Sequence, residues 1–151
     1  MAARPRSGSQ RDRALALPLA LPGAVLTNPF GDDVNVYKVG VGSAAGTPGR
    51  HGGGKMFCLI SLYGEPGMMT LKVDPDRGVE LVRAHDSIEP GYHTNKRHWI
   101  SVSLDGSVDD AFLQELVEDS YDLVVSTLSA RARFDVDPDR FPLPPVRRPV
   151  P

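Results

Sequence analysis

The chain has 151 residues, of which 40% are hydrophobic and 24% charged, and its formal net charge at pH 7 is −2. This length and apolar content suit one compact domain with some tail, and no apolar run approaches the roughly 20 residues that cross a bilayer. The single cysteine, Cys58, excludes an internal disulfide and lies in the apolar run KMFCLISL, where cysteine is typically a small buried side chain. These features predict a protein of the reducing cytoplasm that has no membrane partner.

Charge is distributed unevenly along the chain. Residues 1–13 carry a net charge of +3 and residues 131–151 a net charge of +2, which leaves −7 for residues 14–130. An acidic body is a poor generic partner for a polyanion, because nucleic-acid binding is driven by Lys and Arg side chains that replace counterions. We predict a domain over 14–130 between two disordered tails, a basic one over 1–13 and one rich in Pro and Arg over 131–151.

The first predicted element is a short helix over 11–21. The arginines before it imitate the charged start of a secretory signal, but Pro18 interrupts the short apolar part, and we expect the segment to belong to the domain. Alternation then predicts strands over 34–39, 55–62 and 68–73, and the second of these is apolar on both faces, which favours a central position. Residues 40–54, between the first two strands, hold seven of the 15 glycines and are predicted to form a flexible loop.

The second half of the chain predicts two helices around a strand. A helix is expected over 75–86, because Asp74 can cap it and proline suits its first position. A strand over 99–104 follows, and then a helix over about 109–128 with apolar residues at helical spacing. The outer face of that last helix carries no cation and six acids: Asp109, Asp110, Glu115, Glu118, Asp119 and Asp122.

The order of these elements, α-β-β-β-α-β(-β)-α, determines the predicted fold class. Short connections between successive strands imply hairpins and therefore antiparallel pairing. One face of such a sheet needs cover, which the helices can supply. We therefore predict an α+β two-layer sandwich, with an antiparallel sheet of about five strands and helices on one side.

Five segments of the sequence are informative together: LALPGA, NPFGDDVNVYKV, GGKMFCLIS, LKVDPDRGVELVRAHDSIEPGYHTNKRHWISVSLDG and DDAFLQELVEDSYDLVVSTL. They resemble the MmcQ/YjbR family of small bacterial proteins. The segment from Lys72 to Trp99 is the most specific part of the resemblance, and PGYHTNKRHW is close to a signature of the family. The resemblance implies a double-wing or YjbR-like unit over about residues 14–130 and a DNA-binding role, with no catalytic residues to carry over. This sequence departs from the family pattern in the long loop 40–54, which replaces a tight turn, and in both tails.

The candidate binding residues lie within GYHTNKRHW, residues 91–99. Its cations suit phosphate contacts, its amide suits a base edge, and its rings suit stacking on an unpaired base. If this segment extends the strand that follows, alternation places Arg97 and Trp99 on one face and Lys96 with Ile100 on the other. A second interpretation is structural, with Lys96 and Arg97 neutralising the acidic last helix. The candidate residues are Tyr92, His93, Asn95, Lys96, Arg97, His98 and Trp99.

Other chemistries lack a complete set of residues. The histidines do not follow a zinc-ligand spacing, the segment GRHGGGK enters a strand where a phosphate-binding loop opens a helix, and no nucleophile has a placed base. We expect no metal, no cofactor and no enzymatic activity. The leading hypothesis is a small module that binds DNA weakly and with strong salt dependence. The alternative is an accessory domain that binds a small molecule or a protein at the sheet face near Trp99.

Overall fold

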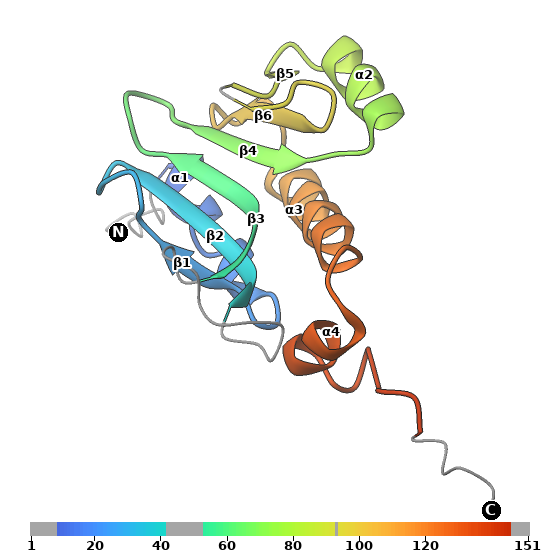
Figure 1. Ribbon diagram of the computed structural model, residues 1–151. Helices are drawn as coiled ribbons and strands as arrows, with labels where there is room; N and C mark the ends of the chain where they lie inside the picture. Colours follow the sequence, from blue (N-terminus) through green and yellow to red (C-terminus); the bar gives the residue numbers. More distant parts are fainter. Residues whose placement is uncertain (1–8, 42–52, 93, 146–151) are drawn as a thin grey trace, which may run out of the picture.

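The computed structural model describes residues 9–41, 53–92 and 94–145 (Figure 1). Its strands are β1 (Val25–Thr27), β2 (Val34–Val41), β3 (Gly53–Ser61), β4 (Met68–Lys72), β5 (Ile88–Pro90) and β6 (Trp99–Ser103). Its helical elements are α1 (Gln10–Ala14), the 3-10 helix η1 (Pro18–Ala20), α2 (Pro75–Ala84), α3 (Asp110–Val125) and α4 (Ala130–Val136). Within the described ranges, no helix is long and apolar enough to cross a bilayer.

All six strands belong to one antiparallel sheet, in the order β1-β2-β3-β4-β6-β5. The predicted α+β class and antiparallel pairing are confirmed, with one strand more than the predicted five. β1 and β5 have only three residues each, which is too short for an alternating pattern to be recognised. β2 and β3 extend to Val41 and Gly53, so they take the two ends of the predicted loop 40–54, and residues 42–52 lie outside the described residues.

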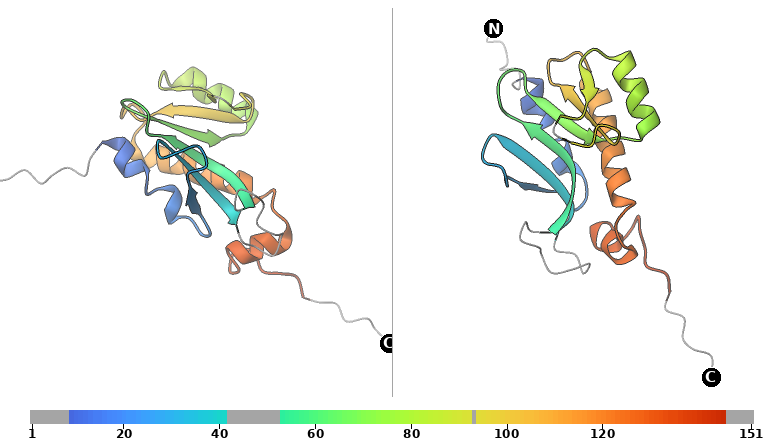
Figure 2. Two further views of the ribbon diagram at one scale, coloured as in Figure 1. Left: turned by 60° about the vertical axis from the view of Figure 1, so that its left-hand side comes forward. Right: turned by 45° about the horizontal axis from the view of Figure 1, so that its top comes forward.

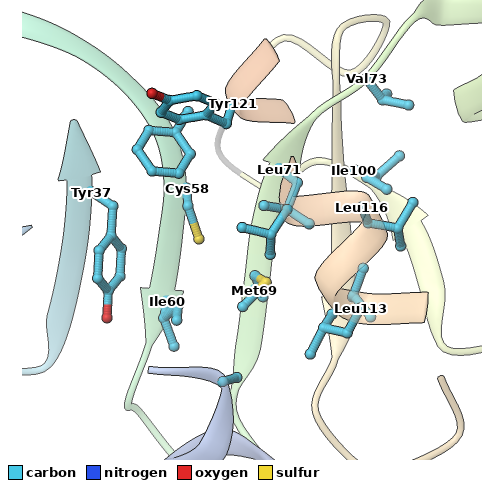
Figure 3. Close-up of a cluster of buried hydrophobic side chains, with 14 of the residues drawn as sticks. Tyr37, Cys58, Ile60, Met69, Leu71, Val73, Ile100, Leu113, Leu116 and Tyr121 are labelled. Atoms are coloured by element: carbon cyan, nitrogen blue, oxygen red, sulfur yellow. The ribbon is translucent and has the colours of Figure 1, made fainter. Parts of the chain in front are cut away.

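The helices cover one face of the sheet. α3 packs on β3 and β4, and α2 packs at the β5–β6 end (Figure 1, Figure 2). The register between β4 and β6 aligns Met69 with Val102 and Leu71 with Ile100, which gives one buried apolar face. Leu113 of α3 belongs to the same core (Figure 3). Since a fully buried side chain of this size contributes about 1.5–3 kcal/mol, the contact between α3 and the sheet stabilises the domain substantially.

A β-bulge explains the sequence pattern of β3. Tyr37 of β2 pairs with Cys58, but the next residue of β2, Lys38, pairs with Met56, so Phe57 is an extra residue. A bulge lets two successive side chains turn to the same face, and both Phe57 and Cys58 are completely buried. The Phe57 ring meets Tyr121 of α3 edge to face, with ring centroids 5.3 Å apart. The apolar residues at both odd and even positions are thus accommodated in a central strand.

The N-terminal helix α1 is anchored to the turn that leads into α3. The side chain of Gln10 is 7% exposed, and its amide nitrogen donates to the Val108 carbonyl at 2.6 Å and to an Asp110 carboxylate oxygen at 3.0 Å. Its amide oxygen accepts the Gly106 N–H at 3.0 Å. All the polar atoms of a buried amide are therefore satisfied by residues about a hundred positions downstream.

Arg11 anchors the same helix to the turn between β3 and β4. Its guanidinium donates to the carbonyls of Leu62 and Gly64 and pairs with Glu65 at 3.1 Å. The assignment of residues 1–13 to a disordered tail is therefore wrong for residues 10–13, while residues 1–8 lie outside the described residues. The predicted helix over 11–21 is divided into α1 and η1, because Pro18 has no N–H to continue the helical ladder.

The C-terminal segment also belongs to the fold over much of its length. Ser129 caps α4 by accepting the Ala132 N–H at 3.1 Å, and Ala132 is buried. Arg140 pairs with Asp122 of α3 at 2.8 Å, and Phe141 packs against the core. The prediction of a disordered tail from residue 131 is therefore wrong for α4, and residues 146–151 lie outside the described residues. The prolines that dominate the composition begin only after α4 has ended.

The three hydrogen bonds of the Gln10 side chain predict that its truncation lowers the stability of the fold. We expect Gln10→Ala to lower the free energy of unfolding by about 1–3 kcal/mol, because the buried carbonyl of Val108 and the N–H of Gly106 lose their partner. Urea denaturation measures the difference. Gln114→Ala removes the same group from the exposed face of α3, where surface truncations change stability by about 0.5 kcal/mol or less. Equal effects of the two variants contradict the proposed role of Gln10.

The buried phenol of Tyr121 predicts that the free energy of unfolding depends on pH in the alkaline range. Its hydroxyl donates to the Pro22 carbonyl at 2.6 Å, and burial raises its pKa from 10.0 to about 12, with Asp137 adding to the shift. Since the folded state holds this proton more tightly, the stabilisation is complete below pH 10 and is lost as the pH rises toward 12. We expect the free energy of unfolding to fall more steeply over this interval in the native protein than in Tyr121→Phe. Parallel curves contradict this assignment.

Candidate functional site

Between β5 and β6, the described residues of the segment 91–98, which are 91–92 and 94–98, form a tight loop and do not extend a strand. The N–H of Gly91 donates to the Trp99 carbonyl at 2.9 Å, and the last loop carbonyl, that of His98, accepts the N–H of Val73 at 2.8 Å. Asn95 closes the turn before Trp99, since its side-chain oxygen accepts the Arg97 N–H at 3.0 Å. Such an Asx turn competes with strand geometry, so the loop has a defined shape at the end of the sheet.

Contacts across the base of the loop fix its position on the sheet. The N–H of Tyr92 donates to the hydroxyl of Ser101 at 3.0 Å, and that hydroxyl is 2.9 Å from the hydroxyl of Thr70 on the neighbouring strand. Gly91 leaves no room for a side chain, since a Cβ there lies 2.1 Å from Thr94 Oγ1 and 2.7 Å from the Trp99 Cβ. The glycine of GYHTNKRHW is therefore required by close packing.

The structure separates the predicted site residues. Trp99 is half-buried and pairs with Lys72, on the sheet face opposite Ile100, as alternation predicts. Arg97 lies beside Lys96 on the α2 side of the loop, and the predicted grouping of Arg97 with Trp99 is wrong because the Asx turn ends the alternation. His98 and Tyr92 are exposed, and His93 lies outside the described residues.

A groove runs between α2 and the 91–98 loop, and we call it the α2 groove. Its volume is about 380 Å³. Its floor is apolar and is formed by Pro75, Val79, Val82, Pro90 and Ile100. Its polar lining consists of Asp76, Arg83, Lys96 and Arg97. The groove therefore combines hydrocarbon surface with three cations and one carboxylate. Sequence reasoning missed the contribution of α2, because only the fold brings Val79 and Arg83 opposite the loop.

The acidic face of α3 is neutralised by arginines from other segments. Arg13 pairs with Asp110 at 2.7 Å and Arg77 pairs with Asp119. The hydrogen bond from Arg13, followed by that from Gln10, holds the pKa of the Asp110 carboxyl below its usual value. With the pair of Arg140 and Asp122, three of the helix's acids have an arginine partner.

Lys96 and Arg97 form no ion pair with the acids of α3 within the described part of the chain. Lys96 Nζ donates to the neutral carbonyl of Gly91 at 3.1 Å, and no described carboxylate forms an ion pair with it. The side chains of Arg83 and Arg97 have no hydrogen-bond or ion-pair partner among residues 9–41, 53–92 and 94–145. Three cations of the α2 groove are thus available to an external anion.

Residues suited to covalent chemistry or metal binding are not brought together. Burial raises the pKa of the Cys58 thiol well above its ordinary value, which disfavours the reactive thiolate. No group of three His, Cys, Asp or Glu side chains with metal-site geometry occurs within the described part of the chain. Of the glycine-rich segment 49–55, residues 53–55 belong to β3 and the others lie outside the described residues.

A second groove of about 330 Å³ lies between α2 and α3. The Arg77–Asp119 pair is on its wall, together with Lys72, Asp74 and Asp122. Acids outnumber bases in this lining, and the cation of the ion pair is already engaged. This second groove therefore offers less to an anion than the α2 groove.

Comparison with known proteins identifies the family. The family model described as YjbR matches residues 19–123. The YbdF protein of Escherichia coli O157:H7 is 38% identical over 131 residues, which cover 86% of this chain and 96% of that protein. The YjbR protein of Escherichia coli K12 is 32% identical over 78 residues, 52% of this chain and 66% of that protein.

A solved structure supports the same conclusion. The crystal structure of the Deinococcus radiodurans protein DR2400 is 35% identical in sequence and superposes with a TM-score of 0.68, covering 91% of each chain. The resemblance carried by PGYHTNKRHW is thereby confirmed, and α1 and α4 lie outside the range that the family model matches. The chain belongs to the YjbR family of small bacterial proteins.

Proposed function

We propose that this protein is a non-enzymatic module that binds nucleic acid, DNA in the first instance, through the α2 groove and the 91–98 loop. The observation that carries the proposal is which charged side chains have an ion-pair partner and which do not. Three acids of α3, namely Asp110, Asp119 and Asp122, are paired with arginines from elsewhere, while Arg83, Lys96 and Arg97 face solvent without a described carboxylate partner. Cations that are not needed for internal neutralisation are the usual means of contacting phosphate.

The rest of the molecule limits the affinity. The net charge of −7 over residues 14–130 opposes a polyanion, and each phosphate contact makes the slope of log K against log salt more negative by about 0.7–0.9. Binding is therefore weak and salt-sensitive. The tails add less than their composition suggests, because Arg11, Arg13, Arg131 and Arg140 all have carboxylate partners within the domain.

The turns at the other end of the sheet are poor candidates for the same role. Residues 28–33, between β1 and β2, carry Asp32 and Asp33, and the turn after β3 carries Glu65. All three carboxylates are on exposed residues. Like charges at these turns repel a phosphate backbone, so the contact is assigned to the loop after β5.

A second candidate function is the binding of a small amphipathic anion in the same groove. The specific observation in its favour is the concave apolar floor, since ligand sites are typically concave, largely apolar and supplied with a few polar groups. Val79 is 53% exposed on this floor and gains burial when a ligand covers it. Competition between a single nucleotide and an oligonucleotide separates the two candidates, because a small-molecule site binds the nucleotide as tightly as the longer chain.

A double substitution tests the nucleic-acid proposal. We expect Lys96→Ala with Arg97→Ala to make the negative slope of log K against log salt shallower by about 2, because two phosphate contacts are lost. Fluorescence anisotropy of a labelled oligonucleotide, at several salt concentrations, measures this slope. The matched control is Lys55→Ala with Arg131→Ala, which removes the same charge from exposed residues that do not line the groove. If both pairs give the same loss, only net charge matters and the site assignment is wrong.

The tight packing around Gly91 predicts that the loop shape supports binding. We expect Gly91→Ala to displace the loop, to lower stability by about 1–3 kcal/mol through overpacking, and to weaken oligonucleotide binding. Emission from Trp99, the single tryptophan, reports the displacement directly. Gly106→Ala is the control. A Cβ at residue 106 meets no atom within 4 Å, so this substitution costs only the strain of an alanine at a positive φ of 88°. Its emission spectrum is expected to match that of the native protein.

A further inference from the structure

We infer that the α2 groove holds one unpaired base, and that the protein therefore binds single strands in preference to duplex. This inference rests on the proposed nucleic-acid function and specifies its substrate class. It follows from three properties of the groove: its hydrocarbon floor, its cations beside that floor, and its size.

The hydrocarbon floor is the property that favours single-stranded nucleic acid over duplex. Val79 remains 53% exposed, and Val82 and Pro90 line the groove next to it. A duplex keeps the faces of its bases stacked inside and presents phosphate, sugar and base edges to a protein. Placing phosphate on hydrocarbon without hydrogen bonds is unfavourable. An unpaired base, in contrast, offers an apolar face that every base possesses, whatever its edge.

The cations are placed for the neighbouring phosphates and not for the base edge. Lys96 is held at the loop by its bond to the Gly91 carbonyl, and Arg97 follows it in the turn closed by Asn95. Arg83 reaches the groove from α2, on the opposite wall. A base on the floor thus has cations on both sides, and a guanidinium plane can also stack on the ring.

The size and shape of the groove agree with one nucleotide. A volume of about 380 Å³ lies within the range of about 300–1,000 Å³ that is usual for sites of small ligands. The groove lies between α2 and a short loop, so its two walls come from different elements. The single carboxylate of the lining, on Asp76, repels phosphate but can accept a hydrogen bond from an exocyclic amino group of a base.

The test uses the full chain and three oligonucleotides of equal length at one low salt concentration. They are a labelled single strand of mixed sequence, its duplex, and a single strand whose bases have been removed to leave the same phosphates. We expect the intact single strand to bind about tenfold more tightly than the abasic strand, because only the intact strand has a base whose apolar face can be buried on the hydrocarbon floor. The duplex is expected to bind no more tightly than the abasic strand.

Two variants show whether the groove is responsible. Val79→Ser removes hydrocarbon from the floor at a helix position that is already exposed, so folding is retained, and it is expected to abolish the preference for the intact strand over the abasic one. Ala84→Ser makes a similar change on the same helix outside the groove and is expected to leave the preference intact. Lys96→Ala is expected to weaken binding of both strands by the same factor, because its ammonium group contacts phosphate only.

The outcomes separate this inference from the function on which it rests. Equal binding of the abasic and intact strands, or tighter binding of the duplex, overturns the unpaired-base inference and leaves the nucleic-acid function standing. A preference for the intact strand that survives Val79→Ser also overturns it, because the base then lies elsewhere. Absence of binding to all three oligonucleotides at low salt removes the nucleic-acid function and the inference together.

Discussion

The ion pairs that bind α3 to its surroundings govern the surface chemistry of this protein. The helix presents acids on its outer face, and arginines from three separate segments of the chain, Arg13, Arg77 and Arg140, reach three of them. Exposed pairs of this kind each contribute only about 0–1 kcal/mol to stability. Their larger effect is on the distribution of charge, because they pair three acids of the helix without using Lys96 or Arg97. Lys96 and Arg97 face solvent beside an apolar groove.

Most of the fold follows from short-range patterns in the sequence. The caps of α2 and α3 and the alternation in β2, β4 and β6 are local signals, and the structure confirms those elements to within a few residues. β1, β5 and α4 carry no comparable signal because they are short. Their formation depends on long-range contacts, such as the pairing of β1 with β2 and the packing of Ala132, which no local pattern reports.

The candidate site could be located from the sequence only in part. The density of cations and rings marked residues 91–99, and the structure retains Lys96 and Arg97 as exposed groups. The predicted faces depended on the segment continuing as a strand, and the side chain of Asn95 prevents this by capping a turn. The opposite wall of the groove comes from α2, which precedes the loop by several residues and has an ordinary amphipathic pattern. A pattern of that kind does not show which loop the helix will face.

The docking of α1 has a consequence for how the chain reaches its native state. Gln10 and Arg13 contact Val108 and Asp110, which lie nearly a hundred residues further along. During synthesis the N-terminal helix therefore emerges long before its binding surface exists. A helix of five residues is too short to be stable alone, so its full set of contacts can form only after the start of α3 has left the ribosome. These contacts have a high sequence separation, which is the kind that slows folding.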